Sequence, residues 1–116
     1  MKSDQAFVDS LNRVVNQNYT NPNFDVVSMA VAMKTSDRQL QRKLKAQIGQ
    51  SPMRHLRQFR LEQSLQYLRK GVPVGEAAQA VGFSSHAYFT SCFRARFGVT
   101  PIRMQLSLES ARLADS

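Results

Sequence analysis

The sequence predicts an all-α protein of seven helices, forming two helix-turn-helix subdomains joined by a long linking helix. Three observations support this prediction. Apolar residues recur at the spacing of amphipathic helices, and no useful stretch alternates with the period of a strand. Residues typical of helix starts and stops divide the chain into seven segments. One pattern of such residues also occurs twice, 49 residues apart.

The first two predicted helices are separated by a loop. Apolar residues repeat at i, i+1, i+4, i+7 and i+8 along the first helix: Phe7, Val8, Leu11, Val14 and Val15. Pro22 lies among asparagines that tolerate turn geometry, so the helix ends before it. Asp25 is a suitable N-cap for a short helix over 26–33. Lys34 and Thr35 then form a tight turn.

The third and fourth helices are bounded by strong start and stop residues. Ser36 followed by Gln39 is a capping box, which predicts the start of the third helix. Gly49 ends it, because glycine adopts the left-handed conformation at the lowest energetic cost. Ser51 and Pro52 then have the order expected of an N-cap and a first helical position. The resulting linking helix runs to about Lys70, with apolar contacts that include Leu56, Phe59, Leu65 and Leu68.

The second half of the chain repeats these signals. A fifth helix is predicted over 74–81, Gly82 forms a turn, and Ser85 caps a sixth helix. Gly98, Thr100 and Pro101 close the sixth helix and open the seventh. We expect four parts: 1–51 with the first helix-turn-helix, 52–70 as the linking helix, 71–108 with the second helix-turn-helix and final helix, and 109–116 as a frayed tail.

The repeat is visible in two strings, KAQIGQSPMR at 45–54 and RARFGVTPIR at 94–103. In both copies a short helix, a tight turn and a capped second helix precede the Gly stop, which is the order of a helix-turn-helix unit. A linking helix of 19 residues spans about 28 Å at 1.5 Å per residue, which is comparable with the spacing of successive major grooves of DNA. The recognition helices, at about 36–48 and 85–97, are therefore expected to enter successive major grooves.

Composition points to a polyanionic partner. The 116 residues include 16 Lys and Arg against 8 Asp and Glu, a net charge of +8. Eight of the basic residues lie between Lys34 and Arg60, where Asp37 is the one acid. Such an excess suits nucleic acid, or less often an anionic membrane surface. No apolar run is long enough for a bilayer span and no signal peptide opens the chain, so we expect a cytoplasmic protein without a membrane partner.

The string GFSSHAYFTSCFRARFGVTP, with LQRKLKAQIGQSPMRHLRQFRLEQSLQYL upstream, resembles the DNA-binding domain of the AraC/XylS family of bacterial transcription regulators. The resemblance covers about Asp25 to Gln105. It implies seven helices, promoter binding and RNA polymerase as a further partner. The N-terminal segment is similar to versions fused to two-component sensor or receiver modules, which implies an N-terminal sensing or dimerisation module in a longer chain. Lys34 stands where the family's first turn often has Gly.

The third helix is expected to read bases. Leu40, Leu44 and Ile48 define its inward edge, and the basic residues project from the opposite side. Arg pairs bidentately with guanine and Gln with adenine. By resemblance, the base-reading positions are Arg38, Gln41 and Arg42. Ser36 and Lys45 are expected to make phosphate or other DNA contacts.

The sixth helix carries a weaker reading face. Phe89, Phe93 and Phe97 point inward. Ala87 and Ser91 stand where the family often has Ser and a basic residue, so base reading is expected only from Thr90 and Ser91. Phosphate or other contacts are expected from four further residues: His86, Ala87, Tyr88 and Arg94. The first unit should therefore read sequence and the second should mainly anchor.

Other functions receive less support. Two His and one Cys lack metal-ligand spacing, and we expect no metal, cofactor or catalytic residue. The single Cys92 excludes an internal disulfide. Two alternatives stay open: a basic helical protein-interaction module, and the DNA-binding segment of a recombinase or transposase.

Overall fold

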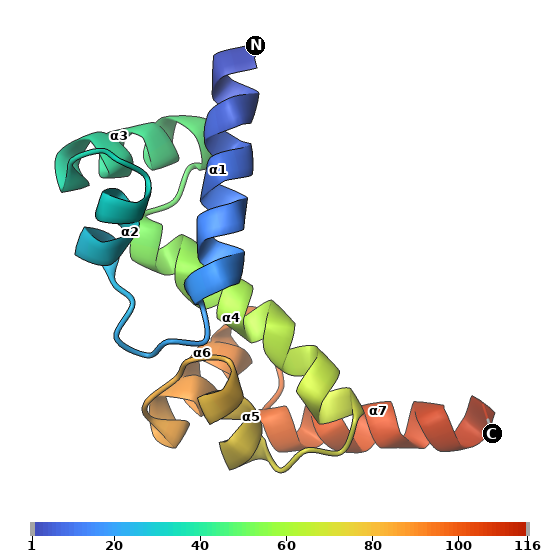
Figure 1. Cartoon of the computed structure of the whole chain (residues 1–116). Helices are drawn as coiled ribbons and strands as arrows, with labels where there is room; N and C mark the ends of the chain where they lie inside the picture. The colour runs from blue at the N-terminus through green and yellow to red at the C-terminus, as the bar shows by residue number, and fades with distance from the viewer. Residues whose placement is uncertain (1, 116) are drawn as a thin grey trace. The chain divides into compact units, whose positions relative to one another are not determined.

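The computed structural model describes the backbone of residues 2–115 and the side chains of residues 4–113. Seven helices follow one another along the chain (Figure 1): α1 (Lys2–Asn18), α2 (Val26–Ala32), α3 (Asp37–Ile48), α4 (Pro52–Arg69), α5 (Val74–Ala80), α6 (His86–Phe97) and α7 (Pro101–Asp115). The described residues contain no strand. The predicted all-α class with seven helices is confirmed.

The chain forms two compact units, Met1–Phe59 and Arg60–Ser116. The helix-turn-helix α2–α3 belongs to the first unit and α5–α6 belongs to the second. Helix α4 is continuous from Pro52 to Arg69, so its first residues belong to the first unit and the remainder to the second. Each unit has a core of its own.

The core of the first unit lies among α1, α2, α3 and the start of α4. Its buried members are Leu11, Val14, Val15, Phe24, Met29, Ala30, Leu40, Leu44 and Leu56. The predicted inward edge of α3 is confirmed, with Leu40 and Leu44 fully buried and Ile48 packed against the cluster. Each fully buried Leu contributes about 1.5–3 kcal/mol relative to an exposed one. This burial holds α3 in place and leaves its opposite face outward.

Aromatic rings fill the core of the second unit. Phe89 and Phe93 are fully buried, and consecutive ring centroids lie 5.0 Å apart for Phe83–Phe89, 5.6 Å for Phe89–Phe93 and 4.6 Å for Phe93–Phe97. The tilted and edge-on arrangements are the ones that aromatic pairs favour. The predicted inward edge of α6 is therefore confirmed, and its opposite face is left outward as on α3.

The predicted helix boundaries of both repeats are present. The Ser36 hydroxyl accepts from the Gln39 N–H at 3.2 Å, and the Ser85 hydroxyl accepts from the Tyr88 N–H at 3.1 Å. Both helices end in left-handed glycines, Gly49 with φ 80° and Gly98 with φ 81°. These caps satisfy backbone groups that each helix itself leaves unpaired. Because they lie at matching positions in the two copies, both recognition helices have 12 residues.

The turns of the two repeats differ by one residue. The same backbone hydrogen bonds close both: Thr35 N–H to Ala30 and Lys34 N–H to Val31 in the first, Phe83 N–H to Ala78 and Gly82 N–H to Gln79 in the second. These positions are 48 residues apart, whereas the caps Ser36 and Ser85 are 49 apart. The second turn therefore has one extra residue between its left-handed position and the cap. Lys34, with φ 58°, is the one described non-glycine residue with positive φ.

Helix α7 runs from Pro101 to Asp115 and so includes most of the segment 109–116 that was predicted as a frayed tail. Helix α7 continues through residues 109–115, because no Gly or Pro follows Pro101 and the sequence is rich in Leu, Ala, Glu and Arg, which favour helix. The side chain of Gln105, which is 7% exposed, donates to the backbone oxygens of Leu68 and Val72 at 3.2 and 2.7 Å. This residue ties α7 to the C-terminal end of α4.

Candidate nucleic-acid interface

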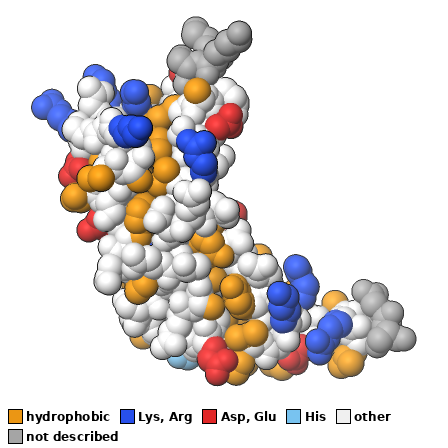
Figure 2. Space-filling view, in the orientation of Figure 1, with side chains coloured by type: hydrophobic (Ala, Val, Ile, Leu, Met, Phe, Trp, Pro, Cys, Tyr) orange, Lys and Arg blue, Asp and Glu red, His pale blue; other side chains and the backbone are white. Residues whose placement is uncertain are grey.

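The outward face of α3 presents the predicted base-reading residues. Arg38, Gln41, Arg42 and Lys45 are all exposed, on the side opposite the buried Leu40. Lys and Arg side chains gather over α3 in the space-filling view (Figure 2). An exposed helix face with guanidinium, amide and ammonium donors can bind phosphate oxygens and the acceptor atoms of guanine.

One contact within this face was not expected from the sequence. Arg42 Nη2 donates to Oε1 of Gln39 at 2.7 Å. The predicted capping box assigned the Gln39 side chain to the N-cap; instead its carbonyl oxygen contacts Arg42, three residues further along α3. Gln39 is exposed beside the base-reading positions, and the i, i+3 spacing of Gln and Arg was the only signal that could have revealed it.

The basic residues between Lys34 and Arg60 do not share one surface. Lys43 Nζ lies 5.7 Å from the Phe7 ring centroid, and the neighbouring Gln47 donates to Asp4 at 3.0 Å, so this flank of α3 packs against α1. Arg60 is 7% exposed, and burial lowers its pKa. The charge count therefore overstates the basic surface of the outward face, since Arg60 is buried and Lys43, although exposed, lies on the flank of α3 that faces α1.

The outward face of α6 is less charged than that of α3. A shallow hollow of about 590 Å³ is lined by Ala87, Thr90, Ser91, Arg94, Ala95 and Thr100. The structure thus brings together four of the predicted DNA-contact residues on α6 and adds Ala95 and Thr100, which the sequence did not indicate. Ser91 and Arg94 are exposed and Thr90 is half-buried. With small side chains along it, this face can approach a partner closely but offers few donors.

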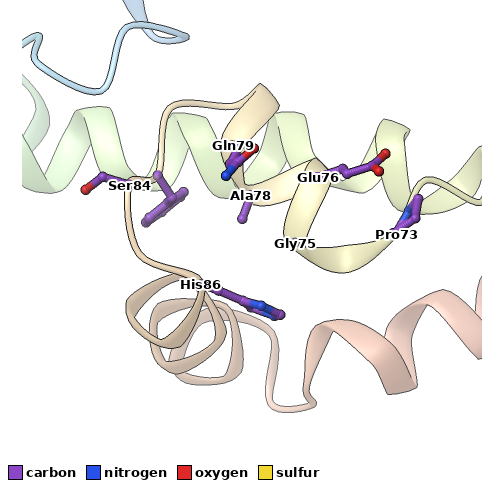
Figure 3. A pocket seen from close by; sticks show the side chains of 8 residues that line it. Pro73, Gly75, Glu76, Ala78, Gln79, Ser84 and His86 are labelled. Atoms are coloured by element: carbon purple, nitrogen blue, oxygen red, sulfur yellow. The ribbon is translucent and has the colours of Figure 1, made fainter.

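The other two predicted residues of α6 lie outside this hollow. Tyr88 is 52% exposed and its ring lies 6.1 Å from that of Phe83. His86 lines a separate pocket of about 320 Å³ with residues of α5 (Figure 3). A Cβ placed on Gly75 would lie 3.6 Å from His86 Nδ1, so the imidazole is close to the first turn of α5. His86 is exposed at the start of α6, where a DNA contact stays a prediction.

Two arginines near the end of α6 have different surroundings. Arg94 lines the hollow on the outward face. Arg96 Nη2 lies 3.5 Å from Glu62 Oε1, and its guanidinium carbon lies 5.1 Å from the Phe97 ring centroid. Arg96 therefore joins α6 to α4 within the second unit, while Arg94 faces outward.

The described residues include no helix that is both long and apolar enough to cross a membrane, and no group of three or more His, Cys, Asp or Glu side chains placed to hold a metal ion.

Comparison with known proteins identifies the family to which these two helix-turn-helix units belong. The family model described as "Helix-turn-helix domain" matches residues 29–106. A transcriptional regulator of Chromobacterium violaceum, described as having an AraC-type DNA-binding domain, has the same fold with a TM-score of 0.83. At 24% identity the match covers 93% of this chain and 96% of that one. The chain belongs to the AraC family. The predicted family and DNA-binding function are confirmed, and the family's domains are DNA-binding transcription regulators, which are not a class of enzyme.

Two further similar proteins extend this comparison. The DNA-binding domain of AdpA, solved in complex with a target DNA, is 25% identical with a TM-score of 0.80, covering 89% of this chain and 96% of that one. Histidine kinase P4 of Formosa agariphila is 28% identical over 103 residues, which is 88% of this chain and 8% of the kinase. The chain spans less than half the length of the curated relatives it matches.

Proposed function

We propose that this AraC-family domain reads promoter sequence mainly through α3 and is anchored on DNA mainly by α6. The observation that carries the proposal is the outward face of α3, where Arg38, Gln41 and Arg42 are exposed while the opposite edge of the helix is fully buried. Arg and Gln are the side chains whose donor pattern matches guanine and adenine edges in the major groove.

In this proposal the second unit contributes weaker base reading. Thr90 and Ser91 provide hydroxyls for base edges or methyl groups, and the small side chains of the α6 hollow allow a close approach to the groove. The remaining predicted contacts serve the phosphate backbone or the rim of the groove: Ser36, Lys45, His86, Ala87, Tyr88 and Arg94. In this proposal α3 and α6 enter successive major grooves, because each unit presents a capped helix of 12 residues with an outward face.

We further propose that the domain is the output part of a longer cytoplasmic regulator. The match to a small fraction of a histidine kinase supports a preceding sensing module, and promoter binding gives RNA polymerase as the expected second partner. DNA binding accounts for the exposed basic face without any catalytic step, and we propose none. Family membership favours this function over a recombinase segment or a protein-docking module.

Selection of bound sites from random duplex DNA tests the base-reading proposal. We expect a preferred sequence with one strongly specified half, containing guanine, and one weakly specified half. Arg42→Ala should relax one or two positions in the strong half only. A site with two equally specified halves, or a preference that Arg42→Ala leaves intact, would contradict the division between α3 and α6.

A salt titration tests the anchoring role with a matched control. If about five phosphates are neutralised, log K should fall with log salt at a slope of about −4.5, and Arg94→Ala should reduce that slope by about one phosphate. Arg96→Ala removes the same charge two residues away, but Arg96 is paired with Glu62, so the slope should stay unchanged. Equal effects of the two substitutions would show that only net charge matters.

A further inference from the structure

We propose that Gln39 is a positioning residue that sets the base preference of Arg42. This inference rests on the proposed function, in which Arg42 contacts a base. Gln39 acts on Arg42 through a hydrogen bond of 2.7 Å, in which Arg42 Nη2 donates to Oε1 of Gln39. The structure places both side chains on the exposed face of α3.

The backbone of Gln39 is fixed before DNA binds. Its N–H donates to the Ser36 hydroxyl at 3.2 Å, and it lies in the first turn of α3, directly before the fully buried Leu40. The Gln39 carbonyl oxygen therefore extends from a fixed point on the helix. A guanidinium bonded to that oxygen has a defined orientation, whereas a solvated Arg samples many rotamers.

Restricting Arg42 in the free protein favours binding. Arg loses much of its rotamer entropy when it is immobilised. Where part of this ordering already exists in the unbound state, association requires less of it. The gain applies only to DNA whose acceptors match the preset orientation, so the Gln39 contact should affect discrimination between bases more than affinity for DNA in general.

The donor count leaves Arg42 able to read guanine. A guanidinium has five N–H donors, and the bond to Gln39 uses one of them on Nη2. The remaining hydrogen of Nη2 and those of Nη1 still form a fork for guanine O6 and N7. The Gln39 amide nitrogen is a donor as well, so the pair presents donors toward the groove. The base that fits this arrangement is guanine.

The second unit lacks this pair. At the offset of 49 residues, Gln39 corresponds to Tyr88 and Arg42 to Ser91. Tyr88 lies near Phe83, and Ser91 lines the α6 hollow. The positioning contact is thus confined to the helix that carries the Arg-rich face, which fits a division in which only the first unit reads sequence strongly.

A set of variants at Gln39 tests the proposal on the selected DNA site. Gln39→Met keeps the length of the side chain but removes the acceptor, and Gln39→Glu keeps an acceptor for Arg42. Affinities are measured at fixed salt for the selected site, for sites with each guanine replaced, and for scrambled DNA. Far-UV circular dichroism and thermal melting confirm that each variant folds.

We expect Gln39→Met to reduce discrimination at the guanine contacted by Arg42 by about 3- to 10-fold, the range of a single hydrogen bond, with affinity for scrambled DNA unchanged within about twofold. Gln39→Glu should retain the discrimination, even if repulsion by phosphates weakens all binding. In an Arg42→Ala background, Gln39→Met should have no further effect.

Three results would overturn the proposal. Discrimination that survives Gln39→Met while Arg42→Ala abolishes it would remove the role of Gln39 and leave the proposed function of Arg42 standing. Additive effects of Gln39→Met and Arg42→Ala would show that Gln39 contacts DNA by itself. Base preference unchanged by Arg42→Ala would refute the base-reading role of Arg42 and, with it, the positioning role of Gln39.

Discussion

Replacing Lys34 by Gly should stabilise the first unit. Lys34 has φ 58°, and its N–H and that of Thr35 donate to Val31 and Ala30 at 3.1 and 3.0 Å, which hold the residue in the left-handed conformation. A residue with a Cβ is disfavoured there by about 1–2 kcal/mol. Glycine removes this strain but loses about 0.5–1 kcal/mol through its greater freedom in the unfolded chain. The net expectation is a gain of about 0.5–1 kcal/mol.

The assay must report on the first unit, because the chain has two compact units and no Trp. Urea unfolding followed by amide NMR signals from the core around Leu11 and Leu40 meets this need. Lys34→Ala is the control: it removes the same charge and stem but keeps the Cβ, so it should give no gain. If Lys34→Gly is no more stable than Lys34→Ala, backbone strain at this turn is not the cause.

Three further changes test other parts of the structure. Gln105→Leu removes two hydrogen bonds to buried or half-buried carbonyls, so the free energy of unfolding of the second unit in urea should fall by about 1–3 kcal/mol. An unchanged unfolding midpoint would mean that the contact between α7 and α4 is dispensable. Arg42→Ala should lose about 1–3 kcal/mol of binding at the selected site, against less than about 0.5 kcal/mol for Ser91→Ala, measured by fluorescence anisotropy; equal losses would refute the inequality of α3 and α6. Hydrogen bonding from the Ser28 N–H lowers the pKa of Asp25 below its ordinary value of 3.8. The stabilising effect of the Asp25 carboxylate is therefore present above that pH and is lost as pH falls through the lower folded-state pKa. Asp25→Asn, which keeps a cap, should abolish this pH dependence of helix stability in an acid titration followed by the α2 amide signals.

Features that depend on neighbours along the chain could be predicted from the sequence. Asp25, Ser36, Ser51 and Ser85 each accept from the N–H three residues on, as capping chemistry requires. The inward edges of α3 and α6 followed from apolar spacing alone. Such contacts lie within one helical turn, so the local sequence determines them.

Features that depend on a choice between partners could not be predicted. Gln39 can reach either the N-cap or Arg42, and only the structure shows that its oxygen contacts Arg42. Arg60 belongs to a basic segment, yet its position on α4 buries it. Gln105 acts on carbonyls more than thirty residues away, at the end of another helix. The outward faces of α3 and α6 were predicted in advance, but the contacts that orient their side chains were not.

The unequal turns define where the two repeats are interchangeable. From Ser36 to Pro52 and from Ser85 to Pro101 the copies have the same length, the same cap and the same left-handed Gly, whereas upstream of the cap they differ by one residue. A graft that carries the outward residues of one segment onto the other therefore preserves the helix and both of its ends. A graft that begins at α2 or α5 also transfers a turn of the wrong length. Protein engineering of a domain with two strong reading helices should thus place its junctions at the serine cap and the proline, and should leave the phenylalanine edge of the recipient intact.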